Sequence, residues 1–147
     1  NFGAIPAMQR QFYDLDTPGV HVLSSQMLGE IVEFVSGWAA ARQRGEEARL
    51  LVHCHMGASR STATALIALA VLHGPGNEAR AFADLLTITN KPWPNYNIVA
   101  MADDLLTRQG LLMAELKRYR ERYPRRLDAY MRLNLRRGQF LPDWPSA

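Results

Sequence analysis

The chain has 147 residues, of which 48% are hydrophobic and 21% charged, a balance typical of a soluble globular protein. We expect one domain over residues 1–147. The longest apolar run, residues 63–72, is far shorter than the roughly 20 residues of a membrane-spanning helix, and no signal-peptide pattern opens the chain. The single cysteine excludes an internal disulfide and favours a cytoplasmic protein. Because the first residue is Asn1 and not Met, the sequence leaves room for a missing N-terminal strand.

The formal net charge of +3 is distributed unevenly. Residues 117–137 hold nine Lys or Arg against two acidic residues, a net charge of +7, so the rest of the chain is at −4. Such a basic helical tail, at 116–147, could bind an acidic partner, RNA or an anionic membrane surface. We favour a solvated outer helix whose apolar side chains pack inward. These apolar side chains are Leu127, Tyr130, Met131 and Leu135.

The first half of the chain predicts strands alternating with helices. Residues 10–16, RQFYDLD, alternate apolar and polar side chains as a strand does, and Pro18-Gly19 ends the pattern. A helix follows, capped by Ser24 or Ser25 and closed by Gly45. The apolar residues at helical spacing in this segment are Leu28, Ile31, Val35 and Trp38.

The rest of the chain predicts one more strand and then helices. The short apolar run at 48–54, ARLLVHC, favours a buried central strand, and the uncharged residues 61–73 favour a helix inside the fold, closed by Gly74 and Pro75. Further helices are expected at 77–88, at 95–110, and on both sides of Pro124. This order of elements predicts an α/β fold with a helical C-terminal half.

The only cysteine lies where the predicted central strand ends and a helix begins, in LVHCHMGASRSTAT (51–64). Backbone N–H groups and the helix dipole favour an anion at such a junction. Gly57 allows the loop to curl, and Arg60 offers a planar fork to two phosphate oxygens. These surroundings favour the Cys54 thiolate, with a pKa that they can lower to somewhere around 3.5 to 7.5, and a thiolate is a ready nucleophile. The Ser61 hydroxyl could donate to the sulfur and help it leave.

The segment HCHMGASRS resembles the signature of the cysteine-dependent protein tyrosine phosphatases, which is His-Cys, five residues, Arg, then Ser or Thr. The order FYDLDTP, helix, LLVHC is similar to that of dual-specificity members, and KPWPNYNIVAMADDLL looks like their Pro-Asn segment. Where many of these carry Gln-Leu, this chain has Met101-Ala102 and then Asp103-Asp104, which is closer to a group of bacterial tyrosine-phosphatase-like proteins. The resemblance covers roughly residues 12–110.

The resemblance implies a central, mostly parallel sheet flanked by helices, and hydrolysis of phosphomonoesters through a cysteinyl-phosphate without metal or cofactor. Cys54 would attack phosphorus, Arg60 would hold the equatorial oxygens, and Ser61 would assist the sulfur. The loop expected to bind phosphate comprises His55, Met56, Gly57, Ala58, Ser59 and Arg60.

A carboxylic acid about 40 residues upstream would protonate the leaving oxygen. Two residues qualify, Asp14 and Asp16. Dual-specificity spacing favours Asp16, whereas the F-x-D segment of the bacterial group favours Asp14. The other aspartate would then be a turn or cap residue.

Three neighbours of the motif have competing interpretations. His53 is either a core histidine of the buried strand or, as the resemblance implies, a supporting residue that hydrogen-bonds the loop. Asn95 is expected mainly as a helix cap, in a supporting position. Trp93 is either packing or a wall for a phenyl ring. The loop contains no lysine, which favours a substrate with a single phosphate.

The sequence thus predicts a protein tyrosine phosphatase, with dual specificity left open, whose substrate is a phosphorylated protein or peptide. Two alternatives remain: an RNA 5′-phosphatase that uses the basic tail, and a phosphate-binding module without turnover. Nucleic acid is the less favoured partner. Steep salt dependence would indicate RNA, because each phosphate contact releases counterions.

Overall fold

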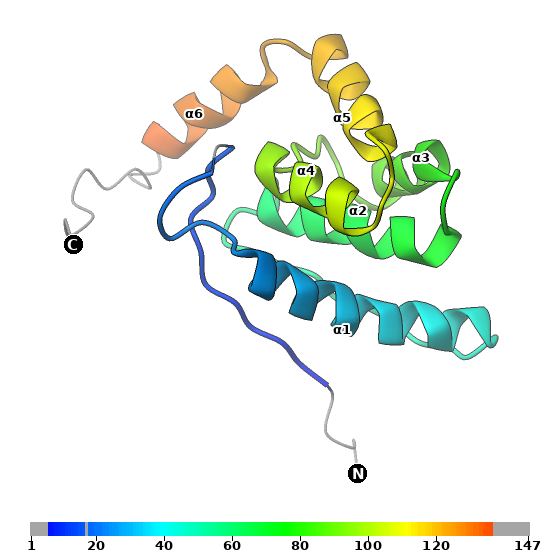
Figure 1. Ribbon diagram of the computed structural model, residues 1–147. Helices are drawn as coiled ribbons and strands as arrows, with labels where there is room; N and C mark the ends of the chain where they lie inside the picture. The colour runs from blue at the N-terminus through cyan, green and yellow to red at the C-terminus, as the bar shows by residue number, and fades with distance from the viewer. Residues whose placement is uncertain (1–5, 17, 137–147) are drawn as a thin grey trace.

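The computed structural model describes residues 6–16 and 18–136. Six helices occur in these ranges: α1 (Ser25–Gln43), α2 (Arg60–His73), α3 (Glu78–Ile88), α4 (Tyr96–Leu105), α5 (Leu111–Arg122) and α6 (Arg126–Arg136). The helix α2 is central and packs against α1, α3 and α4, while α5 lies against α3 and α4 (Figure 1). Residues 6–16 run beside this bundle as an extended segment (Figure 1).

The predicted α/β fold is wrong, because residues 6–16 and 18–136 form no strand and no sheet. A strand is stable only where a neighbour takes up its backbone N–H and C=O groups, and the two predicted strands make no backbone hydrogen bond to each other. The carbonyls of Phe12 and Leu15 accept from side chains instead. In the predicted central strand, Leu51 is 86% exposed. The prediction of a buried strand at 48–54 is therefore wrong, because this apolar run lies at the surface.

The predicted helices of the first half are confirmed. Ser24 caps α1 by accepting from the Met27 N–H at 3.1 Å, and Gly45, with φ of +83°, follows its end. The helix α2 has no charged residue after Arg60 and is buried along most of its length, as expected of a helix inside a fold. The side chains of the core come from all helices of the bundle; the largest fully buried aliphatic ones are Leu28, Leu66, Ile67, Leu85, Ile98, Leu112 and Leu116.

The helix expected at 95–110 ends earlier, at Leu105. Thr107 and Gln109 have positive φ values, so the chain turns there. The buried Asp103 carboxylate stabilises this turn by accepting from the N–H groups of Gly110, at 2.6 Å, and Met113, at 3.1 Å. A side chain of α4 thus caps the start of α5 from a distance, which no local pattern indicates.

One ion pair is buried in the bundle. Glu78, at the start of α3, is 4% exposed, and Arg108, in the turn before α5, is 5% exposed, with 3.1 Å between Oε1 and Nη1. Arg108 also donates to the Ala70 carbonyl of α2 at 2.9 Å. The buried ion pair therefore joins the turn before α5 to α3, and Arg108 also joins this turn to α2.

The basic tail is divided between two structures. The helix α5 packs into the core through Leu112, Leu116 and Tyr119, whereas α6 leaves the bundle after Pro124 (Figure 1). The expectation that the apolar residues of this outer helix pack inward is mostly wrong. Tyr130 is half-buried against the core, but Leu127, Met131 and Leu135 are exposed.

No helix in the described part of the chain has the length and apolarity to cross a membrane. Residues 137–147 of the predicted tail lie outside the described residues.

Candidate active site

The loop at 54–59 joins the surface segment 46–53 to α2, and residues 93–95 bind its backbone. The carbonyls of Ala58 and Ser59 accept from the N–H groups of Trp93, at 2.8 Å, and Asn95, at 3.4 Å. In a trans peptide the N–H points opposite to the preceding carbonyl, so the N–H groups of Ser59 and Arg60 point away from residues 93–95. Gly57 has φ of +70°, the left-handed conformation that the curl of the loop was expected to need.

The Cys54 sulfur lies at the N-terminal end of α2. Its Sγ is 3.2 Å from the Ser61 hydroxyl and accepts from the Gly57 N–H at 3.3 Å. Partial burial acts to raise the pKa of the thiol, but hydrogen bonds from the Ser61 hydroxyl and from the backbone of Ser61, Gly57 and Met56 outweigh it, so that the pKa is lowered. The pKa shift has the predicted direction and Ser61 lies beside the sulfur, while the role of Cys54 as a nucleophile stays a prediction.

Arg60, the first residue of α2, turns its side chain toward the N-terminal segment. Its Nη1 donates to the Phe12 carbonyl at 2.8 Å, and its Nε is 3.7 Å from Oδ2 of Asp14. This Nε is buried and makes no hydrogen bond to any described residue. The nearest anionic group to this guanidinium is therefore the Asp14 carboxylate, and contact of Arg60 with a bound phosphate stays a prediction.

Asp14 is bound directly to the loop. Its Oδ1 accepts from the Ser59 hydroxyl at 2.5 Å and from Nδ2 of Asn95 at 2.9 Å, and its Oδ2 faces Arg60. Because the Ser59 hydroxyl donates to Asp14, it does not cap the first N–H groups of α2. Asp14 and Arg60 therefore lie together beside the first residues of α2, the helix at whose N-terminal end the Cys54 sulfur also lies.

Asp16 has a different environment, although it is only two residues away. It accepts from Arg120 of α5, with Nη1 to Oδ2 at 2.8 Å and Nη2 to Oδ1 at 3.3 Å. Its Oδ1 also accepts from the Tyr96 N–H, the first of α4, at 2.7 Å. These contacts are those of the cap residue that the sequence expected one of the two aspartates to be.

Asn95 connects the helix to the aspartate. Its Oδ1 accepts from the Ile98 N–H at 2.9 Å, so the predicted cap of α4 is confirmed. Its Nδ2 donates both to Asp14 and, at 3.0 Å, to the Leu15 carbonyl. With a side chain that is 1% exposed, Asn95 fixes the position of residues 14 and 15 relative to the loop.

The remaining predicted residues contribute less. His53 is exposed, so its interpretation as a core histidine of a buried strand is wrong, and its supporting role toward the loop stays a prediction. His55 is exposed on the loop, whereas Met56 and Ala58 are half-buried. Trp93 is buried, and the Arg120 guanidinium lies over its ring at 4.6 Å, so this tryptophan is part of the packing.

Two contacts were not anticipated from the sequence. The Ser59 hydroxyl was expected only as part of the phosphate loop, and it is the link between the loop and Asp14. Arg120 was assigned to the basic tail, although it binds Asp16 across 104 residues of chain. The only local signal for Arg120 is its place next to Tyr119 on the buried face of α5, and this does not identify a partner.

The comparisons with known proteins add no relative. No family model, no curated protein and no solved structure matches the chain. Among the described residues, no three His, Cys, Asp or Glu side chains gather as a set of metal ligands. The interpretation of the site therefore depends on its geometry and on the motif.

Proposed function

We propose that the protein is a phosphomonoester hydrolase of the tyrosine phosphatase type that acts through a cysteinyl-phosphate. The observation that carries the proposal is the environment of Cys54, a thiol with a lowered pKa that lies 3.2 Å from the Ser61 hydroxyl at the N-terminal end of α2. In the same loop Ser59 binds Asp14, which faces Arg60. Each group matches a requirement of the reaction, namely a nucleophile, an anion-binding donor and a proton source.

In the first proposed step, the Cys54 thiolate attacks phosphorus in line, an S–P bond forms, and the P–O ester bond breaks. The leaving oxygen takes a proton from Asp14, which is bound to the loop, whereas Asp16 is occupied by Arg120 and Tyr96. Arg60 and the loop N–H groups stabilise the charge on the three equatorial oxygens.

In the second step, water attacks phosphorus, Asp14 takes the proton of that water, and the S–P bond breaks. The products are inorganic phosphate and the Cys54 thiolate, whose negative charge the Ser61 hydroxyl stabilises at 3.2 Å. The loop holds no lysine to meet a second phosphate, so phosphotyrosine in a protein or peptide is the first substrate to test, followed by phosphoserine and phosphothreonine.

The test is hydrolysis of para-nitrophenyl phosphate between pH 5 and 8, with chelator present, by the wild type, Cys54→Ser, Asp14→Asn and Asp16→Asn. We expect chelator-resistant turnover that Cys54→Ser abolishes, and loss of the basic limb of the pH profile in Asp14→Asn alone. Because the chain has one cysteine, a phosphoenzyme trapped by acid quench must be absent from Cys54→Ser. Phosphate binding without turnover in the wild type would reject the hydrolase in favour of a binding module.

A further inference from the structure

The helix α6 carries an aliphatic stripe that the bundle does not cover. Leu127, Met131 and Leu135 are four residues apart, so they lie along one face of the helix, and they are 42%, 47% and 64% exposed. The bundle is contacted instead by the neighbouring face, where Tyr130 donates to the Lys91 carbonyl and Arg126 to the Tyr119 hydroxyl. The helix is thus anchored by polar contacts, and its apolar stripe faces solvent.

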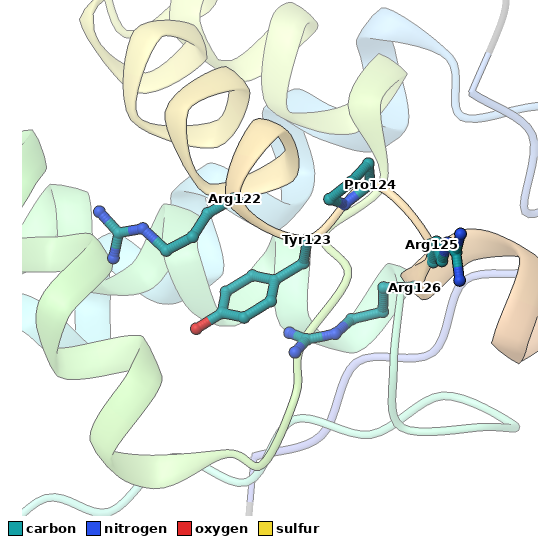
Figure 2. A pocket seen from close by; sticks show the side chains of 5 residues that line it. All are labelled: Arg122, Tyr123, Pro124, Arg125 and Arg126. Atoms are coloured by element: carbon teal, nitrogen blue, oxygen red, sulfur yellow. The ribbon is translucent and has the colours of Figure 1, made fainter.

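Arginines flank this stripe and precede it. Arg132 and Arg136 lie on α6 itself, roughly 100° and 140° around the helix from the centre of the stripe at about 100° per residue. At the junction of α5 and α6, the side chains of Arg122, Tyr123, Pro124, Arg125 and Arg126 line an open hollow of about 420 Å³ (Figure 2). Figure 2 shows the Arg126 guanidinium against the Tyr123 ring, at 3.9 Å from its centroid.

Most arginines in this part of the chain have no acidic partner among the described residues. Arg118 and Arg120 pair with Glu115 and Asp16. By contrast, no described residue forms an ion pair with Arg122, Arg125, Arg132 or Arg136. Arg132 and Arg136 share α6 with the aliphatic stripe and with one acidic residue, Asp128, whereas Arg122 and Arg125 lie at the junction before it. The helix is therefore amphipathic, and the charge of this part of the chain is net positive.

We propose that α6 and the junction before it form a docking surface for an anionic phospholipid membrane. In this arrangement Leu127, Met131 and Leu135 enter the headgroup region, and the arginines bind lipid phosphates while their alkyl stems remain apolar. The helix would lie in the plane of the surface and would not cross it.

This occupant fits the surface better than two others. An RNA backbone would match the arginines but would leave the aliphatic stripe in water. A second copy of the chain, related by a two-fold axis through the stripe, would cover the leucines but would bring two sets of unpaired arginines together. An anionic lipid surface, unlike these two, supplies both an apolar layer and negative charge.

The test is co-sedimentation of the full chain with vesicles of phosphatidylcholine alone or with about one-fifth phosphatidylserine, at low and high salt. We expect binding to the anionic vesicles, at least about tenfold weaker binding to the neutral ones, and loss of binding in high salt. Each arginine near the surface contributes about fivefold, so Arg132→Ser/Arg136→Ser is expected to weaken binding roughly 25-fold.

Matched variants separate the stripe from general surface effects. Leu127→Ser/Leu135→Ser removes side chains that are 42% and 64% exposed, and Leu86→Ser/Ile88→Ser on α3 removes side chains that are 42% and 66% exposed. Only the α6 variant is expected to lose vesicle binding, about tenfold or more, with thermal melts of both near that of the wild type. For the arginines, Arg42→Ser/Arg80→Ser is the corresponding control, at exposed positions of α1 and α3.

Three results would overturn the proposal. Equal loss in the α6 and α3 variants would mean that the stripe has no special part in binding. A short single-stranded RNA bound in the absence of vesicle binding would assign the arginines to nucleic acid. A dimer in light scattering that Leu127→Ser/Leu135→Ser converts to a monomer, again without vesicle binding, would assign the stripe to self-association. None of these readouts depends on phosphatase activity.

Discussion

The Arg120 guanidinium binds the Asp16 carboxylate through two hydrogen bonds, of 2.8 Å and 3.3 Å, and so joins α5 to the segment that carries Asp14. Arg120 also donates to the Pro94 carbonyl at 2.8 Å and lies over the Trp93 and Tyr96 rings. The two neighbouring aspartates therefore have different places: Asp16 joins parts of the fold, and Asp14 is bound to the predicted phosphate loop.

The first prediction follows from that division. Asp16→Ala removes an ion pair that is partly screened by solvent and a cap on α4, so the free energy of unfolding should fall by about 1–2 kcal/mol, while kcat stays within about twofold. Asp14→Asn should do the opposite, with kcat lower by ~10²- to 10⁴-fold and stability nearly unchanged. Urea titration and steady-state kinetics of both variants measure this. Equal kinetic losses in the two would contradict the division.

The second prediction concerns the Cys54 thiol. Because its pKa is lowered in the folded protein, iodoacetamide should alkylate the native chain at a pH where the unfolded chain is still inert, and phosphate should protect it. Ser61→Ala removes the strongest of the hydrogen bonds that lower this pKa, so the midpoint of the rate against pH should move upward. Since this is the only cysteine, the label reports one site. If the midpoint of the alkylation rate against pH is unchanged in Ser61→Ala, Ser61 does not lower the pKa of Cys54.

The same pKa predicts a pH dependence of stability. The thiol loses its proton more easily in the folded state, so the folded state gains stability as pH rises from the lowered pKa to the ordinary value of 9.0, and loses it as pH falls through the lowered pKa. The Cys54→Ser variant should lack this component. The difference between the urea midpoints of the two proteins across pH 5 to 9 measures it.

The third prediction separates two functions of Asn95. Asn95→Asp retains an oxygen that can accept from Ile98 but loses the N–H group that donates to Asp14. The new carboxylate, at a position that is 1% exposed, would face the Asp14 carboxylate and the Leu15 carbonyl. The free energy of unfolding should therefore fall further in Asn95→Asp than in Asn95→Ala, in which the lost cap costs about 1 kcal/mol. Both variants should lose activity, because both release Asp14. If Asn95→Asp keeps the kcat of the wild type, Asn95 acts only as the cap of α4 and does not position Asp14.

The fourth prediction tests the curl of the loop. Gly57→Ala meets no neighbouring atom within 4 Å, so its cost is the left-handed conformation itself, about 1–2 kcal/mol. Gly45→Ala is a matched control, with φ of +83° and equally open surroundings, in the turn after α1. Both should lower stability similarly, but only Gly57→Ala should weaken phosphate binding, as measured by protection of Cys54 from alkylation.

The fifth prediction concerns the buried ion pair. Glu78→Gln leaves Arg108 as an uncompensated charge at 5% exposure and should destabilise the protein by about 3–5 kcal/mol. Glu47→Gln breaks the exposed pair with Arg49 and should change stability by less than about 1 kcal/mol. Chemical denaturation of the two variants gives the comparison. A small effect of Glu78→Gln would mean that Arg108 finds another partner.

Local patterns in the sequence were sufficient for most of the helices and for the motif, although not for the turn that ends α4 at Leu105. The cap at Ser24, the uncharged run that became α2, the cap at Asn95 and the break at Pro124 each depend on residues within a turn or two of one another. The position of Cys54 before a helix N-terminus, with Ser61 in the first turn of that helix, is also local. These caps, helix ends and motif positions can be predicted because the interacting groups are close along the chain.

The tertiary structure alone decided the absence of a sheet in the described residues and the environments of the two aspartates. A strand depends on a distant partner for its backbone hydrogen bonds, so the apolar run around Leu51 could not show by itself that it lies on the surface. Asp14 and Asp16 are equivalent in sequence and differ only in what the fold brings to them, Ser59 and Asn95 for one, Arg120 and Tyr96 for the other. Partners that are 45 to 104 residues apart leave no local signal, because only packing brings them together.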